Sequence, residues 1–243
     1  MTDISTIFFD AGNTLLSPYP SVGATMARVC HSYGIEKTAQ DFDEHMVSFS
    51  EYYAQVYEDD ESFWSEHDRQ QRMWIDGYSL VLRRAGIETD IESLVNDIYN
   101  AFDDACAWSL FAGVEDTFAE LKERGYRIGI ISNWGRGLTE LLEGLGLGPY
   151  IDSVTASAEV GMHKPEPDIF RHALSSLSVS AENAMHVGDH PVADAAGCSA
   201  VGMHPVLIEH ASHTMFDPTV LRGGSGVPRI ASIPEVLSLL GNR

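Results

Sequence analysis

The chain has 243 residues, 44% of them hydrophobic, and its 36 acidic side chains outnumber 15 basic ones, for a formal net charge of −21. Charge of this size repels nucleic acid and anionic membrane surfaces, which excludes both as expected partners, and it suggests a salt-rich source. No stretch reaches the roughly 18 apolar residues of a membrane span, and residues 1–10 lack the features of a signal peptide, so we expect a cytoplasmic protein.

The first predicted strand, at residues 5–9, leads directly to an acidic side chain, Asp10. Four stretches with helical spacing follow, and no strand-like run interrupts them; they cover 23–34, 41–60, 65–86 and 90–108. A block of this length cannot be a loop. The sequence therefore predicts an inserted α-helical domain over residues 17–110, placed after the first strand of a core.

Residues 111–243 alternate between short apolar runs and helical stretches. The runs, at 126–132, 151–157, 183–189 and 199–208, are brief and bounded by Gly, Asp or Pro, which is typical of strands buried on both faces. Helices are expected between them at 113–125, 135–146 and 167–177, whereas 211–226 is rich in turn residues. Together with residues 1–16, this pattern predicts an α/β core with a doubly wound parallel sheet.

Polar side chains follow the predicted strands at their carboxyl ends, where an open parallel sheet binds its ligands. Strands distant in the sequence would thus bring carboxylates, a hydroxyl and an ammonium group to one rim. In chain order these residues are Asp10, Thr14, Ser132, Asn133, Lys164, Asp189 and Asp194.

This set of groups suits phosphoryl transfer. Asp10 could attack phosphorus and form an aspartyl-phosphate. Asp10 and Asp189 are hard oxygen ligands suited to Mg²⁺, which would also offset the repulsion between the acidic protein and a phosphate. Ser132 and Lys164 would hold the phosphate oxygens, assisted by backbone N–H groups at the start of helix 135–146. Asp194 would support the metal ligands from behind.

Four stretches of the chain resemble motifs of the haloacid dehalogenase superfamily, in its branch with a helical cap inserted after the first motif. They are FFDAGNTLL, IISNWG, GMHKPEPDIF and HVGDHPVADAAGC, and they stand in the family's order. The resemblance covers essentially the whole chain. It implies a Rossmann-like core at 1–16 and 111–243 and a cap at 17–110.

The resemblance also implies roles for individual residues. Asp10 would be the nucleophile, Thr14 and Ser132 would position the nucleophile or the phosphate, and Lys164 would stabilise charge. Mg²⁺ would bind to Asp10, to Asp189 and to the main-chain carbonyl of residue 12.

Position 12 departs from the family pattern, because the phosphatases usually carry there a second Asp that protonates the leaving oxygen and later activates water. Gly12 keeps the carbonyl but has no side chain to move a proton, and losing a general acid/base costs about 10²–10⁴ in rate. Substrates whose leaving groups have a low pKa would lose less of this rate. His190 is a conceivable substitute, although a histidine at a helix start is the interpretation we favour. Asn13 tolerates positive φ, so the turn can persist.

The sequence therefore predicts a Mg²⁺-dependent phosphatase of a small phosphate compound, weakened by Gly12. Because of Gly12, a non-catalytic metal- and phosphate-binding or interaction protein on the same fold stays an alternative. A 2-haloacid dehalogenase is a further alternative, since such enzymes also lack the second acid, but the acids of HVGDHPVADAAG argue for a metal. The substrate and the oligomeric state stay open.

Aromatic residues are abundant in the predicted cap, and we interpret them mainly as packing. Trp134 is different because it follows Asn133 at the proposed rim, where it is a candidate for contact with substrate. The cap residues concerned are Tyr52, Tyr53, Tyr57, Trp64, Trp74, Tyr78 and Trp108.

Overall fold

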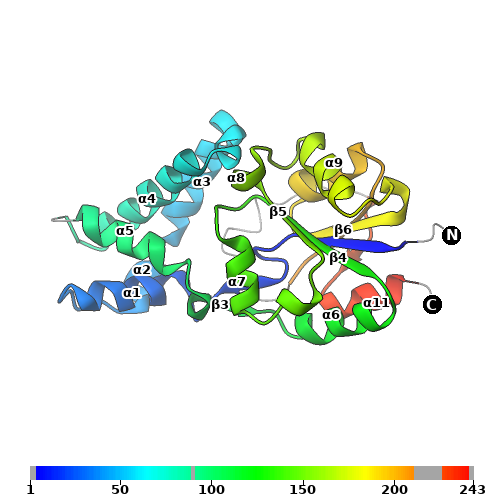
Figure 1. Ribbon diagram of the computed structural model, residues 1–243. Coiled ribbons are helices and arrows are strands. Elements are labelled where there is room, and N and C mark those ends of the chain that lie inside the picture. Colours follow the sequence, from blue (N-terminus) through cyan, green and yellow to red (C-terminus); the bar gives the residue numbers. More distant parts are fainter. Residues whose placement is uncertain (1–3, 89–90, 211–225, 241–243) are drawn as a thin grey trace.

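The computed structural model of the protein describes residues 4–88, 91–210 and 226–240, so most of the turn-rich stretch 211–226 lies outside the described residues. Figure 1 shows a sheet with helices on both faces and, beside one end of that sheet, a layer of helices. In the described part of the chain, no helix has the length and apolar character needed to cross a bilayer.

The main sheet has six strands in the order β5-β4-β1-β6-β7-β8, and every neighbouring pair is parallel. The α/β prediction with a parallel, Rossmann-like sheet is therefore confirmed. The strands are β1 (Thr6–Phe9), β4 (Arg127–Ser132), β5 (Ser153–Ala156), β6 (Ala184–Gly188), β7 (His204–Ile208) and β8 (Arg229–Ile230).

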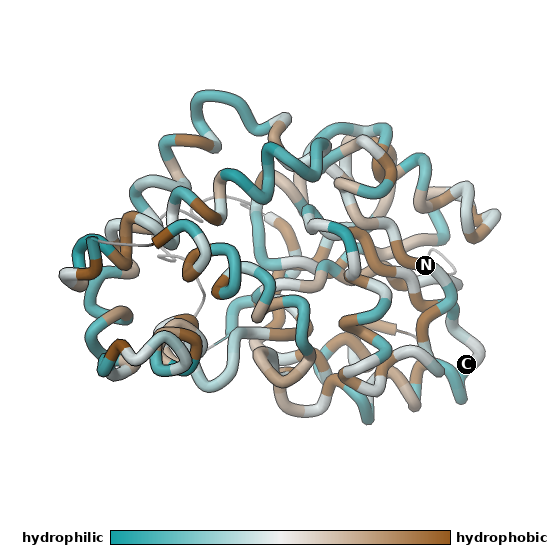
Figure 2. Tube along the Cα trace, turned by 60° about the vertical axis from the view of Figure 1, so that its left-hand side comes forward, coloured by the Kyte–Doolittle hydropathy of each residue, from teal (hydrophilic) through white to brown (hydrophobic). Residues whose placement is uncertain are grey.

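The central strand β1 shows why the apolar runs form buried strands. Its four residues are fully buried, and their side chains alternate between two hydrophobic clusters. Ile7 and Phe9 pack on one face, where the Phe9 ring lies 4.9 Å from that of Phe118, while Phe8 packs on the other face with Phe170. Both faces of the sheet are thus covered, as a doubly wound core requires. In Figure 2 hydrophobic residues accordingly lie in the interior of the core, and hydrophilic residues are frequent on its outer turns.

Helices cover the two faces separately. On one face lie α6 (Val114–Glu123), α7 (Leu138–Gly144) and α11 (Val236–Leu239); on the other lie α8 (Ser157–Val160), α9 (Pro167–Ser176) and α10 (Gly197–Ala200). The predicted run 199–208 is strand only from His204, because its first residues end α10 and form a turn with Gly202 at φ 89°.

The layer beside the sheet, called here the helical layer, comprises, in the residues that the structure describes, five α-helices with a hydrophobic cluster of their own. The predicted stretch 41–60 is divided between two of them, and 90–108 is α-helical only to Ala101, with a short 3-10 helix at Ala105–Ala107. The helices are α1 (Val22–Ser32), α2 (Ala39–Asp43), α3 (Met46–Asp60), α4 (His67–Arg84) and α5 (Ile91–Ala101).

Two short strands, which the sequence analysis did not predict, bracket the helical layer. Strand β2 (Leu16–Pro18) pairs antiparallel with β3 (Trp108–Leu110) where the chain leaves and re-enters the core. Three residues are too few to show a strand period, and this is why no pattern indicated them.

Candidate active site

The predicted site residues meet at the carboxyl ends of three adjacent strands. Asp10 follows β1, Ser132 ends β4 and Asp189 follows β6, and β1 lies between the other two strands. A cavity of about 190 Å³ opens here, lined by these residues from the core and by residues of the helical layer.

One carboxylate oxygen of Asp10 is held and the other is not. Oδ1 accepts hydrogen bonds from Ser132 Oγ (2.8 Å) and from Lys164 Nζ (2.6 Å), whereas Oδ2 accepts none from the residues that the structure describes. Burial raises the pKa of Asp10, and Lys164 opposes that rise. Oδ2 is therefore the oxygen that can attack a substrate.

Lys164 bridges two carboxylates. Its Nζ lies 2.6 Å from Oδ1 of Asp10 and 2.6 Å from Oδ1 of Asp194, and the side chain is almost completely buried. Burial lowers the pKa of Lys164, but the two carboxylates outweigh it and the net pKa is raised. The residue is therefore a buried ammonium ion that orients Asp10.

The side-chain amide of Asn133 forms its hydrogen bonds with the main chain of Lys164. Its Nδ2 donates to the main-chain oxygen of Lys164 (2.9 Å) and its Oδ1 accepts from the main-chain N–H of the same residue (2.7 Å). Asn133 lines the cavity, yet both halves of its amide are engaged in fixing the lysine backbone. Asn133 was expected at the rim as a candidate for contact with substrate or phosphate; that contact stays a prediction, and the geometry gives the residue a positioning role.

Asp194 is a buried residue of the cavity lining and is surrounded by donors. Besides Lys164, it contacts Nε2 of His186 through Oδ1 (2.9 Å) and the main-chain N–H of His190 through Oδ2 (2.9 Å). Burial raises the pKa of Asp194, but Lys164 and His186 lower it by more than burial raises it. The net pKa is therefore lowered, and the carboxylate stays ionised. Gly188 makes this position possible, since a Cβ there would lie 2.2 Å from Cγ of Asp194.

The donor set at the rim fits a hard divalent cation. One carboxylate oxygen each from Asp10, Asp189 and Asp194 lie within 4.8 Å of one another. Burial and the two neighbouring carboxylates raise the pKa of Asp189 well above its ordinary value, which is the charge repulsion that a cation would relieve. Both oxygens of Asp194 already accept hydrogen bonds, so Asp10 and Asp189 are the better candidates to hold Mg²⁺. The carbonyl of Gly12, at the cavity wall, stays a predicted third ligand.

The side chain missing at Gly12 leaves a space that an indole ring occupies. A Cβ at residue 12 would lie 3.3 Å from Cζ3 of Trp134, whose ring centroid is 5.1 Å from that of Trp108. The prediction that Asn13 adopts positive φ is confirmed, with φ 55°. The turn is thus preserved without its second acid.

The turn after Asp10 places Thr14 away from the cavity. Its side chain is fully buried, Oγ1 has no hydrogen-bond partner among the described residues, and Thr14 is absent from the cavity lining. Its main-chain oxygen contacts Nε2 of His210 at 2.9 Å. The predicted contact of Thr14 with phosphate therefore finds no support in this geometry.

The helix expected at 135–146 begins only at Leu138. The segment before it is a loop, in which Trp134 N–H donates to Ser157 Oγ (3.0 Å) and Gly137 N–H to Glu159 (3.3 Å). These two N–H groups are engaged within the protein, which does not support our prediction that backbone donors at the start of this helix hold a phosphate. Ser157, which the sequence analysis did not single out, also donates to the main-chain oxygen of Trp64 (2.7 Å) and so ties the helical layer to the core.

His190 is not placed to replace the missing acid/base. Its Nδ1 accepts hydrogen bonds from the main-chain N–H groups of Val192 (3.2 Å) and Ala193 (3.0 Å). Burial lowers the pKa of His190, so the ring is neutral and its proton lies on Nε2. A neutral imidazole in this tautomer can donate a hydrogen bond into the cavity but cannot accept a proton there.

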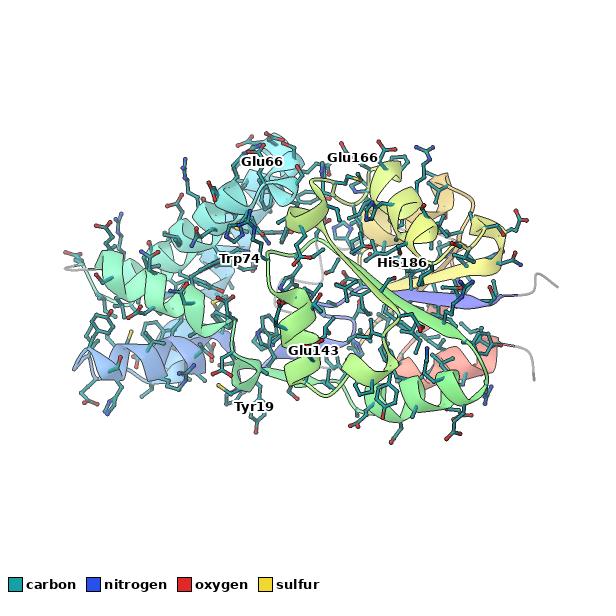
Figure 3. All side chains as sticks on the ribbon, viewed as in Figure 1. Tyr19, Glu66, Trp74, Glu143, Glu166 and His186 are labelled. Carbon is teal, nitrogen blue, oxygen red and sulfur yellow. The ribbon has the colours of Figure 1, made fainter. Side chains whose placement is uncertain are left out.

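The aromatic side chains that we interpreted mainly as packing do belong to hydrophobic clusters, and most of them also form part of the cavity wall, which the sequence analysis did not predict. The missed signal is the i, i+4 spacing of Tyr53 with Tyr57 and of Trp74 with Tyr78, which places each pair on one helix face. Figure 3 shows Trp74 projecting from α4 toward the core. Of the seven predicted packing residues all but Tyr52 line the cavity: Tyr53, Tyr57, Trp64, Trp74, Tyr78 and Trp108.

Comparison with known proteins identifies the family. Residues 4–202 match the model of the haloacid dehalogenase-like hydrolases. The chain belongs to this family. It is 30% identical to human haloacid dehalogenase-like hydrolase domain-containing protein 3, over 98% of this chain and 92% of that protein. It is 28% identical to the glyceraldehyde 3-phosphate phosphatase of Methanopyrus kandleri, over 88% of each.

Among solved structures, the L-2-haloacid dehalogenase RSc1362 shares the fold with a TM-score of 0.70 and 17% identity, over 98% of this chain and 99% of that one. The fold therefore occurs with both phosphatase and dehalogenase chemistry among similar proteins, and the site has to distinguish them.

Proposed function

We propose that this hydrolase is a phosphatase of small phosphate compounds, acting through an aspartyl-phosphate on Asp10. The observation that carries the proposal is the state of the Asp10 carboxylate: Oδ1 is held by Ser132 and Lys164 while Oδ2 is free and faces a cavity bordered by Asp189. The phosphatases among its relatives support the same assignment.

Each residue then has a defined task. Oδ2 of Asp10 forms a bond to phosphorus as the bond to the leaving oxygen breaks and its electron pair departs with that oxygen. Lys164 offsets the charge of the incoming phosphate, and Ser132 and Asn133 fix the orientation of Asp10 and Lys164. Mg²⁺ held by Asp10 and Asp189 would neutralise phosphate charge when bound. The helical layer would act as a cap that excludes water.

Gly12 restricts which substrates this site can process. Residue 12 supplies no proton donor, and the N–H of the neutral His190 imidazole is too weak an acid to protonate the leaving oxygen, so that oxygen departs as an anion. Acyl and aryl phosphates meet this condition because their leaving groups are weakly basic anions. Alkyl phosphates do not, because they would have to release a strongly basic alkoxide. Hydrolysis of the aspartyl-phosphate lacks a base as well, so we expect that step to be slow and the intermediate to accumulate.

The dehalogenase alternative is less well supported by the site. A halide also leaves without a proton, but attack on carbon gives no reason to assemble three carboxylates, two buried and one half-buried, with one oxygen of each within 4.8 Å of the others. The cytoplasmic location and the absence of nucleic-acid and membrane partners stay predictions.

The test is a panel of acetyl phosphate, p-nitrophenyl phosphate, glycerol phosphate and 2-haloacids, with and without Mg²⁺. We expect Mg²⁺-dependent turnover of the first two, a phosphorylated protein detectable by mass, and loss of both in Asp10→Asn. Turnover of a 2-haloacid without Mg²⁺ would favour a dehalogenase, and phosphate binding without any turnover would favour the non-catalytic alternative.

A further inference from the structure

The cavity combines the charged rim with a wall of aromatic rings. All four tryptophans of the chain line it, together with tyrosines from α3, α4 and α5. The aromatic lining residues are Tyr53, Tyr57, Trp64, Trp74, Tyr78, Tyr99, Phe102, Trp108 and Trp134.

The rings form a continuous series that ends at the reacting centre. Ring centroids are 5.9 Å apart from Trp74 to Tyr78, 5.6 Å to Phe102, 5.8 Å to Trp108 and 5.1 Å to Trp134. The last indole lies beside Gly12, two residues from the nucleophile. Any group attached to a phosphate at Asp10 therefore has aromatic surface next to it.

The first rings of the series are held by the packing of α3 against α4. Gly77 lets the helices approach closely, since a Cβ there would lie 2.3 Å from the ring of Phe49. That ring stacks on Trp74 at 5.4 Å and on Tyr78 at 5.5 Å. This end of the wall is thus closely packed, and a packed aromatic surface favours a flat apolar group.

Three buried polar atoms in the wall lack a hydrogen-bond partner among the described residues: the hydroxyl of Tyr57, Nε1 of Trp64 and Oε1 of Gln70, of which only Oε1 of Gln70 cannot donate. Oε1 of Gln70, on α4, has no hydrogen bond to any residue that the structure describes, although the side chain is 3% exposed and lines the cavity. It lies near the core loop, 3.1 Å from the position of a Cβ at Gly135. A buried acceptor without a partner is costly, and a donor on the ligand would satisfy it.

We propose that the substrate is an aryl phosphate whose ring lies against this wall and carries an O–H or N–H donor for Gln70; this inference rests on the phosphatase activity proposed above. Oδ2 of Asp10 bonds to phosphorus, the bond from phosphorus to the aryl oxygen breaks, and the electron pair leaves with the phenolate, which takes its proton from solvent. A phenolate leaves without a general acid, so the ring preference and the glycine at residue 12 have one explanation.

Equilibrium binding tests the ring preference without turnover. Phenylphosphonate and methylphosphonate are titrated into the protein in Mg²⁺, and the quenching of tryptophan fluorescence reports binding because every tryptophan lines the cavity. We expect phenylphosphonate to bind about tenfold more tightly, the scale of one or two aromatic contacts. Trp74→Leu should reduce this ratio, whereas Tyr52→Leu, on α3 but outside the lining, should not. Thermal unfolding verifies that both variants are folded.

Ring-substituted phosphonates test the role of Gln70. At least one amino- or hydroxyphenylphosphonate should bind more tightly than phenylphosphonate, and Gln70→Met should remove that advantage while retaining the preference for a ring. Substituents that make no difference in the original protein would overturn this part of the proposal.

Two results would overturn the ring assignment. One is equal affinity for phenyl- and methylphosphonate. The other is tighter binding of a trimethylammonium-bearing phosphonate, because Trp and Tyr rings also bind cations. Acetyl phosphate, which has no ring, separates this failure from failure of the proposed function: if acetyl phosphate is hydrolysed, only the aryl assignment falls, and if neither it nor any aryl phosphate is turned over, the phosphatase proposal falls.

Discussion

Replacing Gly12 with Asp tests whether a missing proton donor limits the enzyme, and Trp134 decides how far that replacement can succeed alone. A general acid/base is worth about 10²–10⁴ in rate. A Cβ at residue 12 would already lie 3.3 Å from Cζ3 of Trp134, and a carboxyl group needs further room. We therefore expect Gly12→Asp alone to gain less than about tenfold on an alkyl phosphate. Adding Trp134→Ala to this variant should raise kcat/KM for the alkyl phosphate at least about tenfold more. This corresponds to a coupling free energy of about 1.4 kcal/mol between positions 12 and 134.

The assay is kcat/KM for glycerol phosphate and for p-nitrophenyl phosphate, measured across the double-mutant cycle. The gain should be confined to glycerol phosphate, because p-nitrophenolate leaves without a proton. The matched control is Gly12→Asn, which brings nearly the same volume next to Trp134 but no acid. It should leave glycerol phosphate turnover unchanged in both the original and the Trp134→Ala background.

Two outcomes would refute this reasoning. If the Asn variant matches the Asp variant, the gain comes from the loop shape and not from proton transfer. If Gly12→Asp alone reaches the full gain of about 10² or more, Trp134 does not obstruct the acid.

Three further predictions concern charge. Lys164→Met leaves Asp10 and Asp194 without their shared counterion, so we expect loss of turnover and a decrease of about 3–5 kcal/mol in the free energy of unfolding, measured in urea; an unchanged midpoint would contradict this. Mg²⁺ should raise Tm, and Asp189→Asn should lose most of that increase if this carboxylate holds the ion. Raising KCl from about 0.1 M to about 1 M shortens the Debye length from about 10 Å to about 3 Å and should raise Tm at a net charge of −21; a falling Tm would count against our account of the acidic surface.

The position of the site could be predicted because it depends on chain order alone. Asp10, Ser132 and Asp189 each stand at or just after the end of an apolar run. If those runs are parallel strands, their carboxyl ends share one rim whatever the helices between them do. The structure places the three strands side by side, and the three residues meet.

The contacts of individual side chains could not be predicted in the same way. Thr14 is four residues from Asp10, but the left-handed turn at Asn13 determines its direction, and the turn leads it into the interior. Asn133 binds the main chain of Lys164, 31 residues away. No local sequence pattern indicates a contact between residues so far apart in the chain. From the sequence alone, a polar residue at the rim can equally well contact a ligand or hold a neighbouring residue in place.

The aromatic residues show a different limit of sequence reasoning, because packing and ligand contact are not exclusive. Tyr78 belongs to the hydrophobic cluster of the helical layer and also lines the cavity. Through Phe102 and Trp108 its ring is connected to Trp134, and Trp134 occupies the space beside Gly12. A side chain at residue 12 would therefore be in tight contact with the end of the aromatic wall. An Asp at this position would require Trp134 to shift, so the same substitution that supplies a proton donor should also disturb the surface that favours a leaving group needing none.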